Sequence, residues 1–368
     1  MKERGAEVLL LFNEPNLRYA TGATAMPVWS MSTMVRCALV PADGTPILFE
    51  HPNSIHRSRR RAGDVRPMHA WEFFDDPERE AGVWARETLD AVRELGVSGS
   101  TIAVDRLGTP AFLALTRAGS VFVDSAPVMR GARELKTPQE ILLFERNGEL
   151  VLGMLAAFEA AIAPGAREID LLAVLSDAML RGGGEYLATS TVCSGPNTNP
   201  WRAEATARVL ESGDLVFVDT DTVGIEGMFF CVSRTFPVGD REPTRAQRDT
   251  YRAAHGWLEE MRALVRPGLT CGDLARMAPR LAEKYRPQRY ECMIHGVGLE
   301  EESPSVCDPS DDQPNADRVI EENMTLVVEL YAGEVGGEHG VKLGDEVLVT
   351  RDGARVLAPF PFSDALLR

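Results

Sequence analysis

The feature that most constrains the fold is a repeated stretch in the second half of the chain. Residues 161–171 (AIAPGAREIDL) resemble residues 264–274 (LVRPGLTCGDL). In both copies a long helical pattern ends at Pro-Gly and a shorter helical pattern follows. Pro164 and Pro267 stand 103 residues apart. A period this long is not that of a solenoid, and it favours two related halves packed about a pseudo-twofold axis.

The first part of the chain shows a different pattern, in which strand and helix signals alternate. Residues 7–12 are typical of a buried strand, and two strand patterns flank the hairpin turn at residues 41–44. A helix is expected over residues 79–95. We therefore predict an α+β protein with a small α/β domain over residues 1–135 and a pseudo-twofold domain over residues 136–368. The second domain opens on a long helix capped by Thr137.

Charge and cysteine usage exclude several classes of function. The chain carries 39 basic and 55 acidic residues, a net charge of −16, which argues against nucleic acid or an anionic membrane as partner. The six cysteines form no CxxC pair, which argues against a disulfide framework and a structural zinc finger. No apolar run reaches the ~18 residues of a membrane span. No signal-peptide cleavage pattern is visible at the N-terminus, so we expect a cytoplasmic protein.

Three carboxylates stand in unusual places. Asp219 and Asp221 end an apolar strand pattern (DLVFVDTD), and alternation along a strand points both to one face. Such a pair needs a cation or a proton between its members, although a strand that ends in solvent would also explain it. Glu329 lies inside the apolar run MTLVVELY, where an unpaired carboxylate is costly. It needs a metal ion, a protonated histidine or an arginine.

One histidine also stands out from its surroundings. His295 precedes Gly-Val-Gly, and three glutamates follow at residues 300–302. A single histidine is most often structural. One that is held between small residues near acidic groups is more often a ligand or an acid–base group.

Together these motifs resemble a known family. From about residue 137 onward the chain is similar to the pita-bread superfamily of creatinase, aminopeptidase P and methionine aminopeptidase, and within it most closely to the pita-bread dimethylsulfoniopropionate lyases. The first 135 residues match more weakly, through the motif at residues 16–22. The resemblance implies a creatinase-type N-terminal α/β domain over residues 1–135, followed by a pseudo-twofold pita-bread domain. The motifs that carry the resemblance are SGPNTNPW (194–201), FVDTD (217–221), SRTF (233–236), HGVGL (295–299) and GVKL (340–343).

The resemblance implies a metal site that this chain has partly lost. In the family two metal ions are held by aspartates, the histidine and two glutamates. Asp219, Asp221 (an extra ligand of the lyase type), His295 and Glu329 match that pattern. Cys231 and Gly344 replace the two carboxylates that bridge the ions. We therefore expect no dinuclear centre, and either no metal or one zinc or iron ion held by some of Asp219, Asp221, Cys231, His295 and Glu329.

The resemblance also suggests other pocket residues. Tyr290 matches a tyrosine implicated in substrate binding and catalysis, and Glu301 falls where the lyases use an acidic general base. Trp201 and Trp29 could offer aromatic faces to a sulfonium or quaternary ammonium group, or could simply pack in the core. Cys231 as a nucleophile activated by His295 is the least favoured option, because buried cysteines are mostly inert.

These observations lead to one leading function and two alternatives. The leading one is a lyase or hydrolase that acts on a small zwitterionic metabolite, with His295 and Glu301 moving protons and Asp219, Asp221 and Glu329 binding substrate. A creatinase-like or Xaa-Pro peptidase-like C–N hydrolase is one alternative, although the stretch LEEESP after the HGVG motif lacks the further histidine of the peptidases. The other is a non-catalytic binding protein of the same fold. A homodimer is expected, as in relatives that complete their pockets across a subunit contact.

Overall fold

A computed structural model describes residues 1–2, 5–202 and 204–368. These residues form two units, Met1–Arg133 and Glu134–Arg368. Within the described residues, no helix is both long and apolar enough to cross a membrane.

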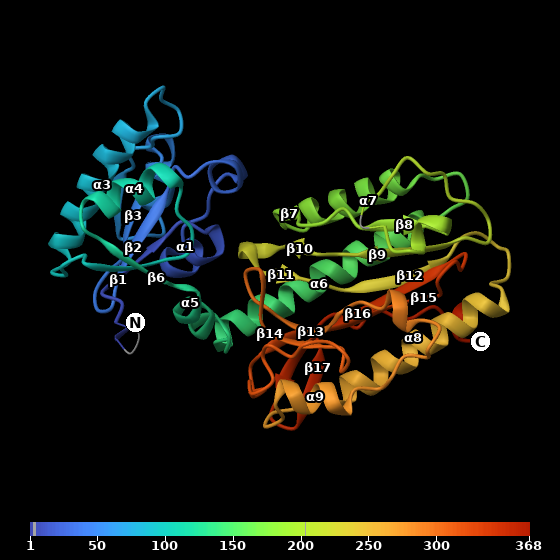
Figure 1. The fold of residues 1–368 in the computed structure, drawn as a ribbon. Coiled ribbons are helices and arrows are strands. Elements are labelled where there is room, and N and C mark those ends of the chain that lie inside the picture. Colours follow the sequence, from blue (N-terminus) through green and yellow to red (C-terminus); the bar gives the residue numbers. More distant parts are fainter. Residues whose placement is uncertain (3–4, 203) are drawn as a thin grey trace. The chain divides into compact units, whose positions relative to one another are not determined.

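The first unit is a mixed sheet with helices packed against it (Figure 1). The strand order is β4-β3-β2-β1-β5-β6, in which β1, β2 and β3 are antiparallel and the other pairs are parallel. The hairpin expected around residues 41–44 is the connection between β2 and β3. The elements are β1 (Val8–Leu11), α1 (Glu14–Thr21), β2 (Cys37–Pro41), β3 (Ile47–Glu50), α2 (Ile55–Ser58), β4 (Asp64–Pro67), α3 (Pro77–Glu94), β5 (Thr101–Val104), α4 (Thr109–Arg117), β6 (Val121–Asp124) and α5 (Ala126–Arg133).

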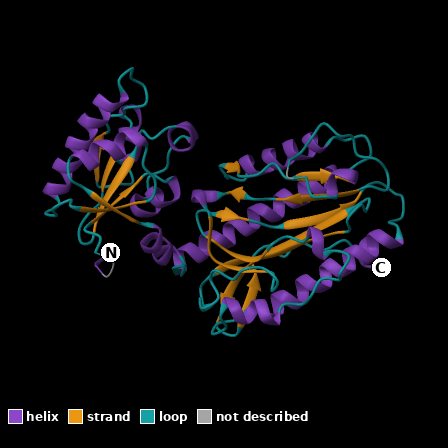
Figure 2. Ribbon diagram, in the orientation of Figure 1, coloured by secondary structure: helices purple, strands orange, loops and turns teal. Residues whose placement is uncertain are grey.

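The second unit is built on a larger sheet with the order β14-β13-β15-β16-β12-β9-β8, and β17 pairs with β16. A smaller sheet joins β11, β10 and β7. Figure 2 shows long helices running alongside the strands. The helices are α6 (Pro138–Ala161), α7 (Glu168–Arg181), α8 (Arg245–Leu264), α9 (Cys271–Met277) and α10 (Asp364–Leu367). The strands are β7 (Tyr186–Leu187), β8 (Val192–Ser194), β9 (Leu215–Asp219), β10 (Thr222–Val223), β11 (Phe229–Phe230), β12 (Ser233–Pro237), β13 (Cys292–Val297), β14 (Glu301–Cys307), β15 (Thr325–Gly333), β16 (Gly340–Thr350) and β17 (Gly353–Val356).

The sequence repeat corresponds to two copies of one local structure. The helices α6 and α8 both begin with a capping box, at Thr137 and Thr244. After each helix a glycine takes a left-handed conformation, Gly165 with φ +95° and Gly268 with φ +87°, which side chains with a Cβ rarely adopt. The backbone N–H of Gly165 donates to Leu210 and that of Gly268 to Ile320, each at 2.9 Å. The predicted duplication is therefore visible in matching hydrogen bonds.

The strands of the larger sheet separate an apolar face from a polar one. Alternate residues of β15 and β16, such as Val328, Leu330 and Leu343, pack with α8 and α9 into the main core of this unit. The residues between them face the other side of the sheet. That side carries the ionisable residues of the candidate site.

Candidate active site

A row of positions crosses four neighbouring strands of the larger sheet. Ser233 of β12 lies opposite Asp219 of β9 on one side and opposite Gly344 of β16 on the other. Gly344 in turn lies opposite Glu329 of β15. Residues that lie opposite each other in antiparallel strands share a face. Asp219 and Glu329 therefore converge on one face of the sheet, and Gly344 contributes no side chain between them.

His295 joins this face from β13. It lies opposite Val327, which is two residues from Glu329 and so on the same face of β15. Its Nε2 is 3.4 Å from Oε1 of Glu329, and its Nδ1 is 3.1 Å from the carbonyl oxygen of Gly296. Burial alone would lower the pKa of His295, but the hydrogen bond and the charge of Glu329 raise it to about 9. With an acceptor at each nitrogen, the ring is an imidazolium at neutral pH.

Lys342 is the second cation of the site, and the sequence analysis missed it. Its Nζ contacts Oε2 of Glu329 and lies 3.3 Å from Oδ2 of Asp219. The side chain is completely buried. Burial opposes the ammonium form, but the charges of Asp219 and Glu329 hold the pKa of Lys342 well above its usual value. Of the partners expected for Glu329, a metal ion, a protonated histidine or an arginine, the structure shows the histidine, and it adds a lysine that was not expected.

Asp219 also binds two neutral donors. Its Oδ1 accepts hydrogen bonds from the Cys231 thiol at 3.2 Å and from the Ser233 hydroxyl at 2.9 Å. Burial, followed by the charges of the neighbouring carboxylates, raises the pKa of Cys231 well above its usual value. Cys231 is therefore a hydrogen-bond donor to a carboxylate. This environment opposes the thiolate that a nucleophilic role would need.

Asp221 lies just beyond the end of β9 and is also buried. Its Oδ2 accepts a hydrogen bond from the Thr189 hydroxyl at 2.9 Å. Burial and the charge of Asp219 raise the pKa of Asp221 to about 7. The repulsion expected between these two aspartates is therefore relieved partly by a proton on Asp221.

Glu346 is a further carboxyl group that the sequence analysis did not place. It follows Gly344 by two residues, so it lies on the same face of β16, and no bulge interrupts the pairing of β16 with β15. Its Oε2 accepts a hydrogen bond from the backbone N–H of Cys231 at 3.0 Å. Its Oε1 has no hydrogen-bond partner among the described residues. Burial raises the pKa of Glu346 well above its usual value.

Two aromatic residues expected in the pocket do lie at the site. The Lys342 ammonium is 4.3 Å from the ring centre of Tyr290 and 5.0 Å from that of Trp201, and the two rings meet edge to face. Lys342 therefore occupies the kind of position in which the Trp201 ring was expected to bind a substrate cation. The indole N–H of Trp201 is buried and has no hydrogen-bond partner among the described residues.

The two remaining predicted pocket residues, Glu301 and Trp29, belong to different units. Glu301 is exposed at the start of β14, and its charge helps to raise the pKa of His295, after the larger effects of burial and Glu329. It is therefore near the imidazolium and in contact with solvent. Trp29 belongs to the first unit, where it stacks on His51 with ring centres 4.3 Å apart. Its role in substrate binding stays a prediction.

The donor atoms at this site do not fit a pair of metal ions. One oxygen of Asp219, the sulfur of Cys231 and one oxygen of Glu329 lie within 4.8 Å of one another. His295 and Asp221 are outside that group in the described part of the chain. The ammonium of Lys342 already contacts two of the three members. The carboxylate missing at Gly344 has no substitute in this group.

Asp345 faces away from the site, as strand alternation requires. Its carboxylate pairs with Arg234, at 2.7 Å, and with Arg262. Arg234 is itself buried and donates to the carbonyl oxygens of Gly344 and Phe360. Asp345 therefore stabilises β16 on the face of the sheet opposite the site.

We expect Asp345→Asn to lower the free energy of unfolding by about 3–5 kcal/mol, because it removes one partner of a buried ion pair. Denaturant titration measures this loss. Asp352→Asn, in an exposed turn, is the matched control and should change little. A fully stable Asp345→Asn protein would show that Asp345 is not structural.

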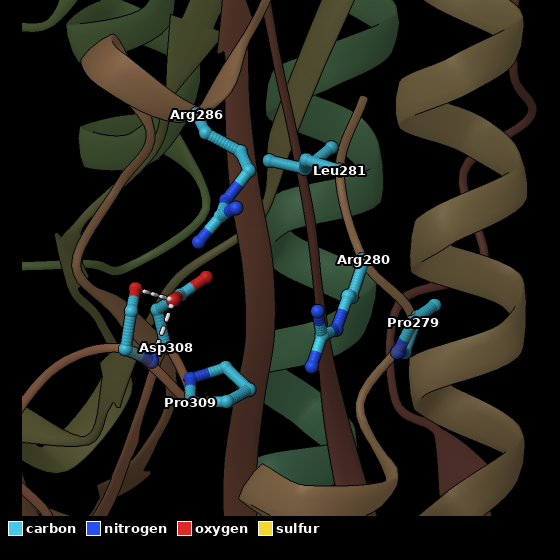
Figure 3. A pocket seen from close by; sticks show the side chains of 7 residues that line it. Pro279, Arg280, Leu281, Arg286, Asp308 and Pro309 are labelled. Atoms are coloured by element: carbon cyan, nitrogen blue, oxygen red, sulfur yellow. Dashed lines mark hydrogen bonds between the residues drawn. The ribbon is translucent and has the colours of Figure 1, made fainter. Parts of the chain in front are cut away.

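A hollow elsewhere in this unit contains none of these residues (Figure 3). Arg280 and Arg286 line it opposite Asp308, and Pro279, Leu281, Pro309 and Ser310 complete it. The polar face around His295, and not this hollow, gathers the residues of the second unit that were singled out from the sequence.

Comparison with known proteins identifies the family to which both units belong. Residues 143–351 match the metallopeptidase family M24, and residues 1–135 match the creatinase/prolidase N-terminal domain. The chain is 31% identical to dimethylsulfoniopropionate lyase DddP of Roseovarius nubinhibens, over 98% of this chain and 83% of that protein. It is 32% identical to dimethylsulfoniopropionate lyase DddP of Roseobacter denitrificans, over 99% and 84%. The prolidase of Pyrococcus horikoshii superposes with a TM-score of 0.79 at 20% identity, over 99% of this chain and 96% of that one.

Proposed function

The chain belongs to the metallopeptidase family M24, and from this membership we propose that it is an enzyme that eliminates or cleaves a bond in a small zwitterionic metabolite. The nearest named reaction is that of the dimethylsulfoniopropionate lyases to which it is similar. The observation that carries the proposal is the buried contact between His295 and Glu329. It keeps a protonated imidazole on the polar face of the sheet, where a substrate group can receive a proton or a stabilising charge.

The charges at the site favour a ligand with both signs. The buried carboxylates of Asp219 and Glu329 are balanced by Lys342 and His295, and Glu301 adds an exposed carboxylate near His295. Two buried polar atoms at the site, the indole N–H of Trp201 and Oε1 of Glu346, have no hydrogen-bond partner among the described residues, and a polar ligand would satisfy them.

The residues of the site can carry out an elimination in which Glu301 is the base and His295 stabilises the negative charge that develops. Glu301 takes the proton from the carbon next to the substrate's carboxylate, and the electron pair of that C–H bond forms the double bond. The group on the next carbon leaves with its bonding pair. The imidazolium of His295 stabilises the negative charge that develops on the carboxylate, and Glu301 releases its proton to solvent.

The proposal is tested with a panel of candidate substrates. Proton NMR would follow sulfonium and ammonium zwitterions with a carboxylate two carbons from the cation, together with creatine and Xaa-Pro dipeptides. We expect turnover of a zwitterion of the first kind. Hydrolysis of the dipeptides alone would assign the chain to the peptidases, and tight binding without any turnover would make it a binding protein.

Affinity should also depend on both substrate charges. The methyl ester lacks the negative charge of the substrate, and the thioether acid lacks the positive charge. Either loss should weaken binding by about 10–100-fold, because it removes a charge-assisted hydrogen bond or ion pair worth about 1.5–3 kcal/mol. Isothermal titration calorimetry with the three ligands measures this. Equal affinity for the zwitterion and the ester would contradict the account.

The oligomeric state and location are further parts of the proposal. We expect a cytoplasmic homodimer. Light scattering coupled to size exclusion distinguishes a dimer from a monomer.

A further inference from the structure

Lys342 stands where three donor groups would otherwise gather around a metal ion. Its Nζ contacts Glu329 and lies 3.3 Å from Asp219, and both carboxylates belong to the group completed by Cys231. We propose that the ammonium of Lys342 is the permanent cation of this site and takes the place of a divalent metal ion. This inference does not depend on the proposed reaction, because it concerns only what holds the carboxylates together.

The positions around Lys342 are consistent with a bound ammonium. The side chain comes from β16 and lies on the same face as Gly344, two residues further along. Tyr290 and Trp201 lie against the ammonium with their rings, at 4.3 and 5.0 Å. Aromatic faces attract an ammonium group and cannot serve as metal ligands. The surroundings of Nζ therefore combine two carboxylates with two rings, a set that suits a lysine.

The other positions at the site provide few ligands for a metal ion. A Cβ atom at Gly344 would lie 2.9 Å from Cβ of Glu329 and 3.2 Å from Oγ of Ser233. A carboxylate at this position would thus require its neighbours to move. The Cys231 thiol already donates to Asp219. A divalent ion that bound Asp219 and Glu329 would also stand beside the ammonium, and the two positive charges would repel each other at low dielectric.

The inference explains why the two ligand losses are compatible with a folded site. Asp219 and Glu329 are almost completely buried, with side-chain exposures of 5% and 2%. Buried carboxylates without a cation would be destabilising. A lysine supplies that cation within the chain, so the bridging carboxylates that two metal ions require are dispensable.

Metal binding by variants of the full-length protein tests the inference. Mn²⁺ is the probe, because carboxylates suit it and exposed thiols compete little for it. Wild-type protein, Lys342→Arg and the exposed-site control Lys284→Ala should hold well under one Mn²⁺ per chain after desalting, by elemental analysis. Lys342→Ala should bind about one ion, at least about tenfold more tightly than wild type, and Mn²⁺ should raise its melting temperature. Adding Asp219→Asn to Lys342→Ala should abolish this binding.

The outcomes separate the inference from its alternatives. One or more tightly bound Mn²⁺ per wild-type chain would overturn it. A folded Lys342→Ala protein that binds no better than wild type would also overturn it. If Lys342→Ala does not fold without metal, folding that is restored by Mn²⁺ supports the inference, and Lys342→Gln, which keeps most of the side-chain volume, repeats the measurement. None of these results requires the substrate, so failure of the proposed reaction would leave them unaffected.

Discussion

Replacing His295 with alanine is expected to lower kcat/KM by about 10²–10³-fold, the usual cost of removing a group that stabilises developing negative charge. The imidazolium contacts Glu329 at 3.4 Å and is buried, and no other histidine belongs to this group of residues in the described part of the chain. Steady-state kinetics on the substrate found in the panel measures the effect. His339→Ala is the matched control in the same unit, because His339 lies beside Thr250 of α8 and outside the site.

The pH profile gives an independent check on His295. Its pKa is raised to about 9 by Glu329, against the opposing effect of burial, so the imidazolium form persists below that pH. The rate should therefore fall as the pH rises through about 9. A folded His295→Ala protein that turns over at nearly the wild-type rate would exclude His295 from the mechanism.

Glu329→Gln is expected to have the largest effect on stability. Its carboxylate contacts both His295 and Lys342, so the substitution leaves His295 without its carboxylate and Lys342 with that of Asp219 alone. Loss of one member of a buried ion pair costs about 3–5 kcal/mol, which corresponds to a fall in melting temperature of about 6–20 °C for a domain of this size. Differential scanning calorimetry measures it. Glu334→Gln, whose side chain is half exposed beside Lys284, is the matched control and should change little.

The pH dependence of this difference has a defined sign. Burial would raise the pKa of Glu329, but the charges of Lys342 and His295 lower it to about 2 from an ordinary 4.5. Its stabilisation is therefore present above pH 4.5 and is lost as the pH falls toward 2. The stabilisation from His295, whose pKa rises from 6.5 to about 9, is complete below pH 6.5 and is lost as the pH rises through 9. The free energy of unfolding of wild type should thus exceed that of Glu329→Gln by the largest amount between pH 4.5 and 6.5. A difference that does not change with pH would contradict this account.

The sequence was sufficient for the local elements and for the duplication. Thr137 and Gly165 act through the backbone within a few residues, so capping and turn chemistry identify them without tertiary information. The pita-bread fold expected from the motifs is confirmed by the family matches and by the solved prolidase.

Lys342 and Glu346 show what the sequence analysis lacked. Both are an even number of residues from Gly344, so the same alternation places them on the site face, yet alternation alone does not give their partners. The contact of Lys342 with Asp219 depends on the register of β9, β12 and β16, which joins residues more than 100 positions apart. The pairing of Glu346 with the backbone of Cys231 depends on the same register. Prediction of these two contacts would have required the cross-strand register, which is tertiary information.

The central claim is that a lysine ammonium and a histidine imidazolium provide the positive charge at a site where family members hold metal ions. A crystal structure of protein purified without chelator, with anomalous diffraction data collected at the manganese, iron and zinc absorption edges, tests it most directly. The account predicts no anomalous peak between Asp219 and Glu329, with Nζ of Lys342 in contact with both carboxylates as it is here. Two anomalous peaks at this position, with Lys342 turned away, would contradict it.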